Sequence, residues 1–162
     1  MGNDGVMIRL FFIVLTACLL PPIIAHASDL EAAFTQAGEN RGQIVLALES
    51  VPADERAGME WLVAHMPQED LQTLDAEFLV ENCSHAYAAW RNAPWHDEIS
   101  EAMFFESILP YASINERRDQ WRADFRSRFA PLVENATTPA EAAAMLNNGM
   151  FKQIGVIYST KR

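Results

Sequence analysis

The sequence predicts a mainly α-helical fold, a bundle of five or six short helices that ends in one β-strand without a partner. Two observations predict the helices. Apolar residues recur at helical spacing between proline and glycine breaks, and residues that cap helices precede several of these segments. A third observation predicts the strand, because β-branched and aromatic residues replace the helical pattern near the C-terminus.

Residues 1–27 have the layout of a secretory signal peptide. Arg9 gives a weakly positive start, residues 10–25 are nearly all apolar, and Ala25-His26-Ala27 is an A-x-A cleavage site. The apolar run is short for a membrane span. We therefore expect an exported protein, periplasmic or extracellular, with no stable membrane span after cleavage.

Charge and cysteine content restrict what residues 28–162 can do. The net charge of −10 argues against nucleic acid as a partner, because phosphate binding needs a cationic face. Cys18 belongs to the signal peptide, so Cys83 has no partner for an intrachain disulfide. Lipid attachment at Cys18 is an alternative to cleavage after Ala27, because Leu15-Thr16-Ala17-Cys18 has the residue types of a lipobox, although apolar residues follow it.

Metal and cofactor sites are not expected. The histidines at positions 65, 85 and 96 are far apart in the sequence and lack paired thiols at the spacing of a zinc site.

Proline and glycine divide the chain into its expected helices. Pro52, Pro67 and Pro110 each separate one segment from the next. An apolar run covers residues 43–48, and the expected helices cover residues 28–38, 54–66, 75–91, 99–109, 113–129 and 138–149.

Three capping patterns open helices in this scheme. Ser28-Asp29-Leu30-Glu31 and Ser113-Ile114-Asn115-Glu116 have the form of capping boxes. Thr138-Pro139-Ala140-Glu141 combines a threonine cap with proline at the first helical position. Gly38 ends the first helix, and Asn147-Asn148-Gly149 ends the last.

The segment from Asp75 to Arg91 is the clearest helix, because one face carries Leu79, Cys83, Ala86 and Trp90. After Gly149 the pattern changes, and Ile154, Val156, Ile157 and Tyr158 predict a short strand. A lone strand has no pairing partner, so we expect more protein to follow.

Cys83 is the residue that most invites a catalytic interpretation. A nucleophilic cysteine needs a facing imidazolium or a helix N-terminus, and His85 points about 200° away around the helix. A buried, small hydrophobic residue is the favoured interpretation. Similarly, helical spacing favours a shared core over a ligand-stacking cluster for the aromatic residues Trp90, Trp95, Phe104, Phe105, Trp121, Phe125 and Phe129.

A dense charged patch consists of Glu116, Arg117, Arg118, Asp119 and Arg122. Its acids could serve in acid/base chemistry, but Glu116 is explained as a capping residue, and Asp119 and Arg122 form a surface pair on a helix. A solvated face is the default interpretation. Glu116, Arg117, Arg118 and Arg122 are the candidates for docking against a neighbouring domain, since arginine forks suit interdomain carboxylates and carbonyls.

A set of short motifs spans about two thirds of the chain. They are Glu60-Trp61-Leu62, His65-Met66-Pro67, Pro94-Trp95, Ile108-Leu109-Pro110-Tyr111, Asn115-Glu116, Trp121-Arg122 and the closing segment 156–162. Together they resemble the helical region upstream of the catalytic core in secreted bacterial transglutaminase-like proteins. Leu109-Pro110-Tyr111, Asn115-Glu116 and Trp121-Arg122 are the most specific.

The resemblance implies a division into residues 28–52, an N-terminal helical extension, and residues 53–162, the helical region that precedes the core. In that family a Cys-His-Asp triad carries out thiol acyl chemistry, and the triad cannot be placed in this chain. The chain is therefore expected to be a truncated module without its own catalysis, and its expected partner is a transglutaminase-like catalytic domain in the same polypeptide. A free-standing exported binding protein is the alternative, and an enzyme that uses Cys83 is a third hypothesis.

Overall fold

The structure is a computed structural model that describes residues 23–113 and 116–155, with side chains described from Ser28 onward. Every regular element in these residues is a helix, as the sequence predicted, and they are more numerous than expected. In chain order they are α1 (Ile23–Ala37), η1 (Gly38–Asn40), α2 (Arg41–Ser50), α3 (Arg56–His65), α4 (Gln68–Thr73), α5 (Ala76–Asn92), η2 (His96–Glu98), α6 (Glu101–Ser107), α7 (Trp121–Val133) and α8 (Pro139–Ile154).

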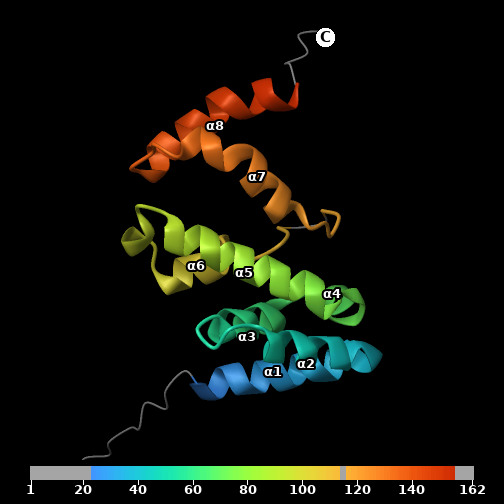
Figure 1. The fold of residues 1–162 in the computed structure, drawn as a ribbon. Coiled ribbons are helices and arrows are strands. Elements are labelled where there is room, and N and C mark those ends of the chain that lie inside the picture. Colours follow the sequence, from blue (N-terminus) through green and yellow to red (C-terminus); the bar gives the residue numbers. More distant parts are fainter. Residues whose placement is uncertain (1–22, 114–115, 156–162) are drawn as a thin grey trace, which may run out of the picture.

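Helix α5 lies at the centre of the fold. Figure 1 shows α1, α2 and α3 on one side of it and the pair α7 and α8 on the other. Contacts join α5 to α2, to α3 and to α7, whereas α8 packs mainly on α7. The chain therefore forms a helical body from α1 to α6 with a helix pair added at its C-terminal end.

One hydrophobic core unites α1 to α6. Its largest fully buried side chains include Ile44, Met59, Leu71, Leu79, Phe104 and Leu109. The predicted boundary after residue 52 falls between α2 and α3, and side chains from both sides of it share this core. Residues 28–52 are thus structurally part of the helical body.

The predicted face of α5 is confirmed. Leu79, Cys83 and Ala86 are fully buried, and the Asp75 side chain caps the helix by accepting from the backbone amide of Phe78 at 2.8 Å. At the start of α8, the Thr138 hydroxyl accepts from the backbone amide of Glu141 at 3.2 Å, as predicted. Local capping rules hold at both helices.

Two amide side chains join the α1–α2 junction to the α4–α5 junction. The Asn40 amide donates to the carbonyls of Leu71 and Leu74, at 2.9 and 2.8 Å. The Gln43 side-chain oxygen accepts from the backbone amide of Ala76 at 2.9 Å. Helix ends leave backbone groups without intrahelical partners, and these two side chains satisfy some of them.

The predicted start of the first helix is wrong. Helix α1 begins at Ile23, so Ser28 lies within it and not at its N-cap. The predicted end is confirmed, because α1 stops at Ala37 and Gly38 adopts a φ of +56°. Residues 1–22, which hold most of the predicted signal peptide and Cys18, lie outside the described residues. None of the described helices is both long and apolar enough to cross a membrane.

The predicted end of the last helix is also wrong. Helix α8 continues through Gly149 to Ile154 and ends at Gly155, whose φ is +73°. A Cβ at Gly149 would lie 2.9 Å from a methyl carbon of Leu132, so this glycine permits close packing of α7 on α8. Ile154, the first residue of the predicted strand, is therefore helical, and Val156 to Tyr158 lie outside the described residues.

Gly58 provides a test of the packing between α3 and α5. A Cβ at this position would lie 2.5 Å from the buried hydroxyl of Tyr87, whereas a Cβ at Gly42 on α2 would meet nothing within 4 Å. We expect Gly58→Ala to lower the free energy of unfolding by about 1–2 kcal/mol, because overpacking exceeds the gain in helix propensity. Gly42→Ala, the matched control, should leave it unchanged or raise it by up to about 1 kcal/mol in urea denaturation.

Candidate functional site

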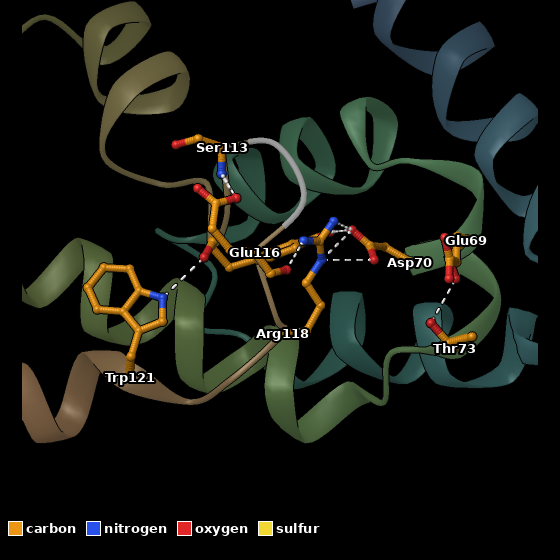
Figure 2. A network of polar contacts seen from close by, with 8 residues as sticks. Glu69, Asp70, Thr73, Ser113, Glu116, Arg118 and Trp121 are labelled. Carbon is orange, nitrogen blue, oxygen red and sulfur yellow. Dashed lines mark hydrogen bonds and ion pairs between the residues drawn. The ribbon is translucent and has the colours of Figure 1, made fainter.

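Tyr111, from one of the most specific sequence motifs, and Arg118, from the charged patch, meet at a buried carboxylate, that of Asp70 on α4. Figure 2 shows Arg118 extending toward Asp70 from the segment that precedes α7. The Arg118 Nε lies 3.0 Å from both carboxylate oxygens, and its Nη2 lies 2.9 Å from one of them. The Tyr111 hydroxyl donates to the same carboxylate at 2.8 Å. We call Asp70, Tyr111 and Arg118 the Asp70 network.

The Asp70 network satisfies a charge that would otherwise be costly to bury. Asp70 is only 4% exposed. Burial and the hydrogen bond to Asp70 raise the pKa of the Tyr111 hydroxyl, so the phenol remains a donor at neutral pH. A buried ion pair of this kind adds little net stability over apolar residues, but its disruption leaves an unpaired buried charge.

Arg122 forms the second network around the same segment. Its Nη2 donates to the carbonyls of Ile108 and Pro110 at 2.6 and 2.8 Å, and its Nε donates to the Asn82 side-chain oxygen at 2.5 Å. The Asn82 amide in turn donates to the Leu109 carbonyl at 2.9 Å. The backbone just after α6 is therefore bound by side chains of α5 and α7.

The acceptors of Arg122 are all neutral oxygens. Burial lowers the pKa of its guanidinium to about 10, so the group still carries its charge at neutral pH. The indole of Trp121 lies beneath this guanidinium, 4.7 Å from it, and donates to the Tyr111 carbonyl at 3.1 Å. Residues 121 and 122 thus attach the first turn of α7 to the loop that follows α6.

The second predicted capping box does not open a helix. The Glu116 carboxylate accepts from the backbone amide of Ser113 at 3.0 Å, which is half of the expected pattern, but residues 116–120 are not helical. Helix α7 begins at Trp121. Because Arg118 reaches Asp70 from an extended segment, tertiary contacts have overridden the local capping signal.

The four residues proposed for docking differ in their surroundings. Arg118 and Arg122 contact other parts of this chain through the networks described above. Arg117 is 86% exposed at its side chain and pairs with Asp119 at 2.7 Å. Glu116 accepts from Ser113. Docking of these residues against another domain remains a prediction.

A second buried acid, Glu55, precedes α3. It is 4% exposed, and its carboxylate accepts from the Arg91 guanidinium at 3.0 Å and from the Ser84 hydroxyl at 2.9 Å. Sequence reasoning missed both Glu55 and Asp70. Each lies in a short acidic stretch that looks like solvated surface, and its arginine partner is 36 or 48 positions away.

Cys83 is buried, as predicted. Burial, with a further contribution from Glu55, raises the pKa of its thiol to about 12. The thiol is thus protonated at neutral pH and poorly suited to nucleophilic attack. His85 does not face it and instead lies 3.6 Å from Glu81. Within residues 23–113 and 116–155, no group of three or more His, Cys, Asp or Glu side chains could hold a metal ion.

The aromatic residues divide between core and surface. Phe104 is fully buried and stacks on Trp90 at 4.4 Å. Phe129 is buried as well, but Phe125 is 47% exposed, so the core interpretation is wrong for Phe125. Its ring lies 5.2 Å from that of Trp121 and 5.3 Å from that of Phe129.

No protein-family model, curated protein or solved structure matches the chain. The site must therefore be interpreted from its own geometry. The residues of the most specific motifs, where described, form hydrogen bonds within the chain and hold the irregular segment between α6 and α7 in place. The geometry is that of a structural anchor for α7.

Removal of the Asp70 carboxylate tests this anchor. Asp70→Ala leaves the Arg118 guanidinium and the Tyr111 hydroxyl without their acceptor, so we expect a loss of about 3–5 kcal/mol in the free energy of unfolding. Asp119→Ala removes the exposed pair with Arg117 and should have a much smaller effect, because solvent screens this pair. Urea denaturation of both variants measures the difference, and equal losses would contradict a buried anchor.

The accessibility of Cys83 can be measured with a thiol reagent. Because the thiol is buried and protonated, we expect alkylation at neutral pH to be slow in the native protein and fast after unfolding in guanidinium chloride. Fast stoichiometric labelling of the native chain would instead restore the hypothesis of a Cys83 enzyme.

Proposed function

We propose that this chain is the N-terminal helical module of a secreted transglutaminase-like protein, a cysteine hydrolase or acyltransferase, and that it supports the catalytic domain without catalysing a reaction itself. The observation that carries the proposal is the interdependence of its motifs. Leu109-Pro110-Tyr111 and Trp121-Arg122 are two of the three most specific motifs of the resemblance. In the fold, Arg122 binds the carbonyls of 108–110, and Trp121 binds the carbonyl of 111.

The chemistry of the described residues agrees with a supporting role. Cys83 is buried with a raised pKa, and its neighbour His85 is engaged elsewhere. The buried acids Asp70 and Glu55 both have arginine partners. These groups are satisfied within the fold, whereas catalytic groups must face a substrate.

The exposed apolar surface favours a module over a free-standing protein. Phe125, Met145, Phe151 and Ile154, all on α7 or α8, expose between 37% and 47% of their surface. Exposed apolar side chains that gather into a large patch mark a surface that binds something, and Phe125 lines the apolar groove between α5 and the α7–α8 pair. A domain that follows α8 in the same polypeptide is the partner that the proposal assigns to this surface.

The DNA downstream of codon 162 tests the proposal directly. We expect a reading frame that encodes a cysteine, a histidine and an aspartate in the order of a transglutaminase-like triad. Unrelated sequence there would rule the proposal out. The alternative, a free-standing binding protein, predicts that purified residues 28–162 are monodisperse, unfold cooperatively and bind little of a hydrophobic dye; strong dye binding in the folded state favours the module.

A further inference from the structure

A groove of about 300 Å³ lies between α5 and the α7–α8 pair. Its apolar lining comes mainly from Phe125, Phe129 and Val133 of α7 and from Leu146 and Met150 of α8. Phe125 stands at its surface, 47% exposed. The groove is separate from the Asp70 network, because none of Asp70, Tyr111 and Arg118 lines it.

The polar residues that line this groove are His85, Arg122 and Arg126, and none of its described lining residues is acidic. This composition is unusual in a chain whose net charge is −10. Five of the chain's 12 lysines and arginines lie between Arg117 and Arg128. Of these five, Arg122 and Arg126 line the groove and make it a local basic surface on an acidic protein.

Two of these arginines have unused capacity to bind an anion. Arg126 is exposed and makes no hydrogen bond or ion pair with another described residue, whereas Arg128, on the same helix, pairs with Asp124 at 2.8 Å. Arg122 binds only neutral oxygens, through Nε and Nη2, so no carboxylate of the described residues offsets its charge. Charge-assisted bonds from guanidinium to carboxylate are strong and directional.

We propose that this groove docks an amphipathic, acidic segment of a partner protein, with apolar side chains against Phe125 and Met150 and carboxylates against Arg126 and Arg122. An apolar floor with a rim of one charge is the arrangement that recognises such segments. The chain's own residues 156–162 contain Lys161 and Arg162 and no acid, so the basic rim repels them. A symmetric pairing of two copies through the groove brings two basic rims together.

The inference goes beyond the proposed function, because it specifies the surface and the chemistry of its partner. It does not require that partner to be a transglutaminase-like domain. If unrelated DNA follows codon 162 and acidic segments still bind the groove, the proposed function fails and the docking inference stands. If a transglutaminase-like frame follows codon 162 and acidic segments do not bind the groove, the docking inference fails and the proposed function stands.

Fluorescence anisotropy with two synthetic peptides tests the inference on the purified chain. Both peptides carry a leucine stripe and a fluorescein label; one has glutamates beside the stripe and the other has lysines. We expect the glutamate peptide to bind at least about tenfold more tightly, with an advantage that falls as salt is added. Equal binding of the two peptides would overturn the inference.

Three variants locate the binding on the chain. Arg126→Glu should weaken the glutamate peptide about tenfold, and Phe125→Ser should weaken both peptides. Arg117→Glu makes the same charge change on an exposed side chain outside the groove lining and should have a much smaller effect. Equal losses in Arg117→Glu and Arg126→Glu would indicate general charge attraction and contradict a docking site.

Sedimentation of the unlabelled chain tests whether a second copy of the chain occupies the groove. We expect a monomer in the absence of peptide. As a control for folding, Arg126→Glu should give the same circular dichroism spectrum as the unchanged chain. A concentration-dependent dimer that Phe125→Ser abolishes would show that a second copy fills the groove, and it would overturn the assignment to an acidic partner.

Discussion

The hydrogen bonds of Arg122 are the constraint on which the C-terminal half of the fold depends. Between the end of α6 and the start of α7 the chain leaves helical structure, so its carbonyl groups need partners from elsewhere. One guanidinium supplies donors to the carbonyls of Ile108, Leu109 and Pro110, and Asn82 adds a second donor to Leu109. Arg122 is also in the first turn of α7. The bonds that satisfy the loop therefore fix where α7 begins and how it meets α5.

The buried acids of the fold also depend on donors from distant parts of the chain. Asp70 and Glu55 are isolated in sequence from the arginines that neutralise them, and each receives further donors, Tyr111 in one case and Ser84 in the other. Such groups contribute little net stability, but they penalise any arrangement that separates them. Both networks join segments far apart in the chain, so they favour one arrangement of short helices over others that would bury a similar apolar area.

Sequence patterns predicted the fold wherever local information was sufficient. The periodicity of α5 and the threonine cap of α8 depend on residues within one or two turns, and both were confirmed. The predicted end of the last helix was wrong because it depends on contacts with another helix. Gly149 was interpreted as a stop signal, but it lies within α8, where a Cβ would lie 2.9 Å from a methyl carbon of Leu132 on α7.

Local sequence patterns also could not reveal the long-range contacts of the candidate site. The sequence identified Arg118 and Arg122 as notable, yet it could not show that their acceptors lie on α4, on α5 and in the loop after α6. Phe125 and Phe129 share a spacing typical of a buried face, but only Phe129 is buried, and Phe125 is 47% exposed. Exposure of this kind depends on where the neighbouring helix ends, and periodicity carries no information about that.

Arg122 belongs to both the anchor and the groove, and this shared position has a physical consequence. Its Nε and Nη2 are committed to neutral oxygens of the chain, which hold the guanidinium in a fixed orientation at the edge of the groove. A side chain held in this way loses little conformational entropy when it meets a ligand. Because its acceptors carry no net charge, the field of the guanidinium extends into the groove instead of being cancelled by a nearby carboxylate, as happens to Arg118 beside Asp70. The bonds that shape the loop thus also preorganise the cation that an acidic partner would meet.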